Sequence, residues 1–214
     1  MNVKQASTYL SIMFFTLLGA CSKSVPISVS GTTPEPLINT IPITMGVIYD
    51  DEFKSYVFKQ TPEEGSKWRI EPADLNIEFL DRVFNTMFRH VSTLDEVPTK
   101  TNRANVQAVL HPSIEEFGFL TPKDTGLNSY SASIKYRIDM FTPTGELIAS
   151  WPIIGYGKSI KKGLSAKKAL NEASRLAIRD GAATIAIDFQ KQTLIRNWLI
   201  DGGFINTRNE LVSQ

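Results

Sequence analysis

Residues 129–141 alternate between two kinds of side chain, and this alternation constrains the fold more than any other segment does. One set is larger and mostly apolar: Tyr130, Ala132, Ile134, Tyr136, Ile138 and Met140. The other set is polar: Ser131, Ser133, Lys135, Arg137 and Asp139. Because successive side chains of a strand point to opposite faces, the pattern predicts a long strand in a sheet that is buried on one face.

Two segments have helical spacing instead. From Ile77 to Leu94, apolar residues recur at steps of three and four, with Pro72 at the expected first position and Pro98 as a stop. The second segment, residues 166–198, carries a stripe of alanines that lets a helix lie close against a sheet. Gly181 within it predicts a bend or a tight contact, because glycine is a poor helix former.

Shorter strands are expected on both sides of the first helix. They are predicted at residues 41–49, 53–59, 67–70 and 104–110, with a loop at 113–128. Residues 142–146 predict a hairpin loop, and the return strand covers 147–151 and extends toward 154. The order of elements predicts an α+β fold, with an antiparallel sheet and two main helices packed on one face.

The first 21 residues have the composition of a secretory signal. Lys4 is followed by an apolar run over residues 9–18, and small residues then precede Cys21. The run is too short to span a bilayer, which takes about 20 residues in a helix. Since Cys21 is the one cysteine of the chain, disulfides are excluded.

Leu18-Gly19-Ala20-Cys21 resembles the lipobox of bacterial lipoproteins. The resemblance implies that the chain is cut before Cys21 and that this cysteine becomes the lipidated N-terminus. Ser22 after the cysteine then implies the outer membrane, with the protein facing the periplasm. The alternative is an ordinary signal peptide whose cleavage site happens to include a cysteine.

The order of elements over roughly residues 41–200 resembles small α+β envelope-assembly lipoproteins, such as the lipopolysaccharide-assembly lipoproteins. Residues 53–70 depart from that arrangement, because they add material before the first helix. The expected organisation is a signal peptide at 1–20, a lipidated cysteine and flexible tether at 21–40, a sandwich domain at 41–200 and a tail at 201–214. The tether is rich in Ser, Thr and Pro, so it buries too little to order itself.

The charge balance gives no global attraction to nucleic acid. The chain has 23 Lys and Arg against 22 Asp and Glu, and removal of residues 1–20 takes away Lys4 alone. The mature chain therefore has no formal net charge, and we expect no nucleic-acid partner.

Motifs for catalysis or cofactors are missing from the sequence. His90 and His111 are not spaced as metal ligands, and no Gly-x-Ser-x-Gly elbow is present. Residues 155–159, Gly-Tyr-Gly-Lys-Ser, approach a phosphate loop, but Pro152 stands where its first glycine is required. We expect no metal, no nucleotide, no cofactor and no enzymatic activity.

Five lysines lie close together near the start of the last helix. A local basic patch of this kind fits anionic headgroups, lipopolysaccharide or an acidic partner, and the alternative is a solvated surface. The residues of this possible anionic-surface contact are Lys158, Lys161, Lys162, Lys167 and Lys168.

These features favour a non-enzymatic outer-membrane lipoprotein that serves as a subunit or docking module of an envelope assembly, in secretion, export or lipid transport. Exposed edge strands offer one mode of attachment to a partner. The alternative is a periplasmic carrier of a lipid or other apolar ligand, which requires a cavity. An envelope hydrolase is the third hypothesis.

Overall fold

The computed structural model describes residues 22–26, 39–60, 67–160, 163 and 165–205. Its main layer is a five-stranded sheet in the order β5-β2-β6-β7-β8. The strands are β2 (Ile41–Ile48), β5 (Phe88–Leu94), β6 (Ala108–Leu120), β7 (Ser129–Phe141) and β8 (Leu147–Ile160). The predicted strand at 129–141 is confirmed, and its larger side chains are the buried set.

The sheet is mixed, so the prediction of a purely antiparallel sheet is wrong. β7 pairs antiparallel with β6 and β8, but β2 runs parallel to both β5 and β6. The physical reason lies in the crossover between β2 and β5. This connection contains a helix, and such a connection returns the chain in the same direction as the strand before it.

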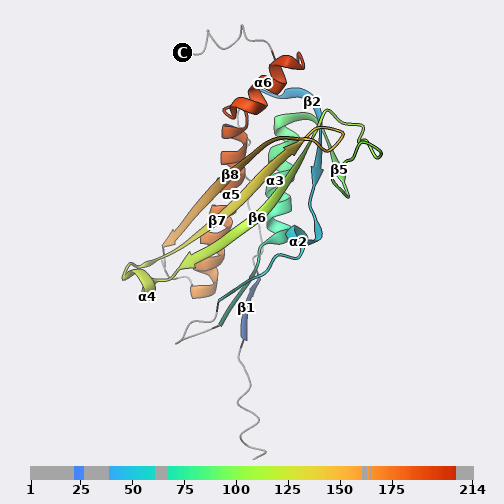
Figure 1. Ribbon diagram of the computed structural model, residues 1–214. Coiled ribbons are helices and arrows are strands. Elements are labelled where there is room, and N and C mark those ends of the chain that lie inside the picture. Colours follow the sequence, from blue (N-terminus) through green and yellow to red (C-terminus); the bar gives the residue numbers. More distant parts are fainter. Residues whose placement is uncertain (1–21, 27–38, 61–66, 161–162, 164, 206–214) are drawn as a thin grey trace, which may run out of the picture.

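Two long helices pack against the sheet and against each other. These are α3 (Ala73–Met87) and α5 (Ala166–Phe189), and Figure 1 shows both behind β6, β7 and β8. Tyr136 of β7 contacts both helices from one side of the sheet. Its hydroxyl donates a hydrogen bond to the Asn76 side chain of α3, and its ring lies against Gly181 of α5. Burial raises the pKa of Tyr136, so the phenol stays a donor.

Helix α5 comes unusually close to β8 because small residues meet on both sides. A Cβ placed on Gly155 would overlap the Ala177 carbonyl oxygen and lie 2.5 Å from the Gly181 nitrogen. A Cβ on Gly157 would overlap the Ala173 carbonyl oxygen. The predicted tight contact at Gly181 is therefore confirmed.

The first predicted helix is wrong beyond Met87, where the chain becomes strand β5. Val91 and Leu94 keep their predicted apolar role, but as half-buried strand residues beside β2. β-branched residues such as Val91 and Thr93 favour strands, and the open parallel edge of β2 is available for pairing.

The region around Pro112 also differs from the prediction. Residues 104–110 and the predicted loop at 113–128 contain one strand, β6, followed by the short helix α4 (Pro122–Thr125). Pro112 is tolerated because β2 pairs with β6 only as far as Leu110. Beyond that point β6 has no second neighbour, so the missing N–H breaks no ladder bond.

A second, three-stranded sheet has the order β1-β4-β3 and contains β1 (Ser22–Pro26), β4 (Lys67–Glu71) and β3 (Phe58–Gln60). Helix α2 (Asp51–Lys54) replaces the start of the strand predicted at 53–59. β1 pairs in parallel with β4, so residues 22–26 of the predicted tether form a strand. Residues 27–38 of that tether lie outside the described residues, as does Cys21.

The last predicted helix divides into α5 and α6 (Thr193–Asp201). Phe204 packs on Trp198 after α6, so the described part of the predicted tail begins with packed side chains. The main core is built from residues between Ile41 and Leu199. Within the described residues, no helix is both long and apolar enough to cross a membrane.

We predict that Gly155→Ala destabilises the fold by about 3 kcal/mol, because the added methyl group meets backbone atoms that cannot move away cheaply. Gly118→Ala on β6 is the matched control. Its new Cβ would meet only Ser133 Oγ at 3.6 Å, so it should change stability by less than about 0.5 kcal/mol. Urea unfolding measures both, and equal midpoints for the two variants would contradict the close packing of α5 on β8.

Candidate functional site

The face of β6, β7 and β8 that points away from α3 and α5 forms an open face (Figure 1). On β7 this face carries the polar set of the alternating pattern, and none of those side chains is buried. The pairing register brings Ser133 of β7 beside Gly118 of β6 and Tyr156 of β8. Two small residues, Gly118 and Ser133, therefore lie beside Tyr156, which belongs to a row of large side chains on β8.

Residues 154–160 of strand β8 depart from the usual pattern of a half-buried strand. Its inward positions include Gly155 and Gly157, which contact α5 and carry no side chain. Its outward positions carry three large side chains: Ile154 is 62% exposed, Tyr156 56% and Ile160 53%. A strand with one wet face normally places its apolar side chains inward. The outward apolar row of β8 is therefore not explained by the core of this domain.

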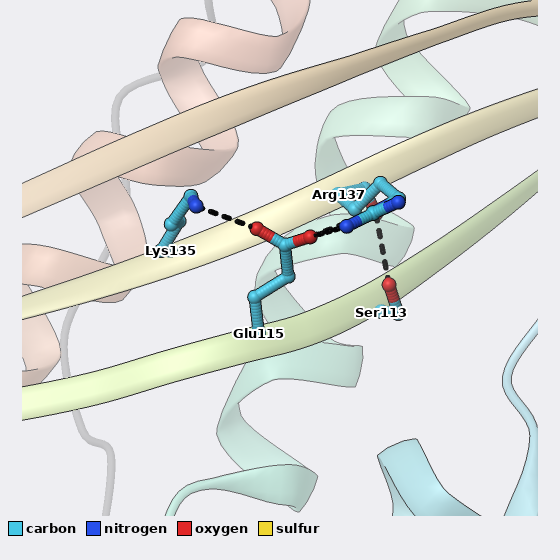
Figure 2. Close-up of polar contacts among 4 residues, drawn as sticks. All are labelled: Ser113, Glu115, Lys135 and Arg137. Atoms are coloured by element: carbon cyan, nitrogen blue, oxygen red, sulfur yellow. Dashed lines mark hydrogen bonds and ion pairs between the residues drawn. The ribbon is translucent and has the colours of Figure 1, made fainter.

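An ion cluster stands beside this row, centred on Glu115 of β6 (Figure 2). The Glu115 carboxylate accepts hydrogen bonds from Lys135 Nζ at 2.8 Å and from Arg137 Nε at 2.6 Å. The Arg137 guanidinium also reaches it through Nη2. The register of β6 against β7 shifts between Ile114 and Glu116, and this irregularity leaves Glu115 without a partner of its own in the ladder.

The electrostatics of the cluster follow from these contacts. Hydrogen bonds from Lys135 and Arg137 lower the pKa of Glu115, so this carboxylate is ionised at neutral pH. The same bond to Glu115 raises the pKa of Arg137. Glu115 thus holds two cations, and the Arg137 guanidinium also interacts with the negative charge of Asp139.

Two hollows flank Glu115. One has a volume of about 400 Å³ and is lined by Asp50, Glu52, Phe53, Tyr56, Ser113, Ile114, Glu115 and Arg137. The other, of about 250 Å³, is lined by Glu115, Lys135, Arg137, Ser150, Trp151 and Pro152. Charged side chains line both hollows, so neither is an apolar cavity.

Asp50 and His111 meet at the edge of the larger hollow, with Asp50 Oδ2 2.9 Å from His111 Nε2. Asp50 also caps α2 by accepting a hydrogen bond from the Phe53 amide at 2.7 Å. Burial acts to raise the pKa of Asp50, but the bonds from Phe53 and His111 outweigh it, and the pKa is lowered. Ser113 Oγ donates to the Arg137 carbonyl, and no hydrogen bond joins Ser113 to His111.

The residues predicted from sequence fall in several places. Lys158 lies on the outward row of β8, and Lys167 and Lys168 are exposed in the first turn of α5. Lys161 and Lys162, like Cys21, lie outside the described residues. Residues 155–159, whose sequence approaches a phosphate loop, belong to β8. Among the described residues, no group of His, Cys, Asp and Glu is arranged to hold a metal ion.

Sequence reasoning missed Glu115 and the outward row of β8. The row has a readable signal, because large residues alternate with glycines over residues 154–157. Glu115 has none, since its partners on β7 depend on the register and on the irregularity beside it.

The outer edge of β8 is partly blocked against another strand. Asp180 of α5 accepts a hydrogen bond from the Tyr156 amide at 2.9 Å, which shows that this amide points away from β7. Pro152, four residues earlier on the same side, has no N–H to offer. Attachment by edge pairing, one of the predicted modes, is therefore hindered here, and the face of the strand is more accessible than its edge.

Comparisons with known proteins give no family. No protein-family model and no curated protein matches the chain. Among solved structures, a putative neuraminyllactose-binding hemagglutinin homolog from Helicobacter pylori is 13% identical, with a TM-score of 0.46, and the match covers 78% of this chain and 96% of that one. The rare lipoprotein B of Shewanella oneidensis is 17% identical, with a TM-score of 0.37 and coverage of 72% and 98%. A minor lipoprotein of Acinetobacter baumannii is 11% identical, with a TM-score of 0.40 and coverage of 70% and 92%. Similarity at this level says nothing about function.

We predict that the Glu115 carboxyl titrates below the ordinary value of 4.5, as followed by NMR of its side-chain carbon. A lowered folded-state pKa adds stability above the unfolded-state pKa, and this stability is lost as the pH falls through the folded-state value. The double variant Lys135→Met/Arg137→Met should return the pKa toward 4.5. A Glu115 pKa at or above 4.5 in the unsubstituted chain would contradict the cluster.

Proposed function

We propose that this chain is a non-enzymatic lipoprotein of the outer membrane, anchored through acylated Cys21, and that it serves as a docking module for a protein of the cell envelope. The support for the anchor is the sequence Leu18-Gly19-Ala20-Cys21 behind a short apolar run. The support for docking is the open face of the large sheet.

Ile154 and Tyr156 of the outward row of β8 carry this proposal. Exposed large apolar side chains that are gathered on one surface favour an interaction site over a solvated surface. Ile154 and Tyr156 stand next to each other on the row, and Lys135 and Arg137 lie on the neighbouring strand. Tyrosine and arginine are the residues that most often dominate protein interfaces. The partner is therefore a protein with an apolar centre against Tyr156 and hydrogen-bond acceptors against Lys135 and Arg137.

The alternative of a lipid carrier has weaker support. Such a carrier needs an apolar cavity, and the natural place would be between the sheet and the helices. Here Gly155 and Gly181 bring β8 and α5 into backbone contact. The hollow of about 400 Å³ lies instead beside Asp50, Glu115 and Arg137, which suit polar groups better than acyl chains.

A hydrolase also has weaker support. The larger hollow contains Ser113, and His111 is bonded to Asp50 at its edge. However, the Ser113 hydroxyl donates its hydrogen bond to the Arg137 carbonyl oxygen and not to His111. The hydrogen bond between a serine nucleophile and a histidine base, which such a hydrolase needs, is therefore not formed.

Photo-crosslinking in living cells tests the docking surface. A photoreactive phenylalanine derivative in place of Tyr156 should yield a specific adduct with an envelope protein, since this side chain is expected at the centre of the interface. The same residue at Leu194, which is 61% exposed on α6, is the matched control and should yield no such adduct. Tyr156→Ala should weaken the purified complex by about 30-fold, as for other central interface tyrosines. Adducts of equal yield from both positions would defeat the docking proposal.

Replacement of the anchor residue tests the other half of the proposal. Cys21→Ala should abolish incorporation of labelled fatty acid, because the chain has no other thiol. The fold should be unaffected, since the described core begins at Ile41. Metabolic labelling followed by fractionation measures the change, and labelling that persists in the variant would contradict acylation at Cys21.

A further inference from the structure

One end of the molecule combines exposed apolar side chains with lysines, and we call it the tip. It is made of the end of β6, the loop after α4, the end of β8 and the first turn of α5. Figure 1 shows α4 and the start of α5 at the same end as β1, with α6 at the opposite end. The residues of the tip are Leu120, Leu127, Lys158, Ile160, Lys167 and Lys168.

The three apolar side chains of the tip are more than half exposed to solvent. Leu120 is 51% exposed, Leu127 57% and Ile160 53%. The register places Leu120 opposite Ser131, Ser131 opposite Lys158 and Ser129 opposite Ile160. Leu120, Lys158 and Ile160 therefore lie at the end of the open face that is nearest to α4. Three large aliphatic groups are thus presented together with a lysine at the end of a sheet.

The described residues assigned to the tip include three lysines and no acid, so the tip carries positive charge. Lys158, Lys167 and Lys168 are all exposed. The first turn of α5 contains no acid, and Ser165 caps this helix through its side chain. Asp124 of α4 accepts hydrogen bonds from the Thr121 amide at 2.7 Å and the Thr121 hydroxyl at 2.8 Å, and its charge interacts with that of Lys123. Lysines at a helix N-terminus oppose the helix dipole, so the stability of α5 does not account for them.

We infer that the tip docks on an anionic phospholipid surface, with Leu120, Leu127 and Ile160 entering the interfacial layer and the lysines meeting lipid phosphates. Lysine is depleted from protein interfaces, whereas lysines around exposed aliphatic groups are typical of interfacial membrane binders. The inference rests in part on the proposed function, because acylated Cys21 would bring the bilayer to this end. β1 begins at the next residue, Ser22, and contacts α5.

Sedimentation with lipid vesicles tests the inference. The chain of residues 22–214 contains every described element and carries no acyl group, so its binding to vesicles does not depend on the lipid anchor. It should bind vesicles of phosphatidylcholine with phosphatidylglycerol, bind weakly to phosphatidylcholine alone, and be released by salt. The triple variant Lys158→Glu/Lys167→Glu/Lys168→Glu should lose at least about fivefold in partitioning for each lysine. Leu120→Ser/Leu127→Ser/Ile160→Ser should also weaken binding.

Lys191→Glu and Leu194→Ser, which lie after α5 and on α6, are the controls and should bind as the unsubstituted chain does. Urea midpoints establish that each variant is folded. No binding to phosphatidylglycerol, equal binding to both vesicle types, or unchanged binding by both tip variants would overturn the inference. The vesicle assay contains neither the acyl chain nor a partner protein. A failure to bind vesicles would therefore contradict the membrane contact of the tip, but not the crosslinks at Tyr156 or the labelling of Cys21.

Discussion

The backbone contact between β8 and α5 is the constraint on which the rest of the structure depends. Gly155 and Gly157 face Ala173, Ala177 and Gly181 with no side chain between them. Such close packing fixes the helix along the sheet, and there Tyr136 also reaches Asn76 of α3. The two helices and the long strands are thereby locked into one unit. The volume between layers that an apolar ligand would need is taken up by this contact.

The same contact determines what β8 presents to its surroundings. Because glycines occupy inward positions, the side chains that give this part of the strand its bulk are outward, at Ile154, Tyr156 and Ile160. The ion cluster at Glu115 then holds Lys135 and Arg137 in fixed directions beside that row. A preorganised surface loses less side-chain entropy on association, which favours its use as an interface.

Local patterns in the sequence predict an element correctly where its packing against a single neighbouring layer determines its structure. The alternation of residues 129–141 predicts β7 correctly, and the alanine stripe predicts the close packing of α5. The stretch from Phe88 to Leu94 has helical spacing but forms β5, because it pairs with the edge of β2. A contact between strands that are distant in sequence cannot be predicted from a local pattern. Lys158 is indicated by charge alone, and its contact with an anionic surface stays a prediction. Glu115 could not be, since its partners are set by the register between strands distant in sequence.

The central claim is that the open face is covered by a protein in the cell. The most direct measurement is the reactivity of a cysteine in place of Tyr156 toward a membrane-permeant maleimide, because the native Cys21 would be acylated and silent. The account predicts protection in the intact envelope and full labelling after purification in detergent. A cysteine in place of Leu194 should be labelled in both states. Equal labelling of the residue 156 cysteine in both states would contradict the account.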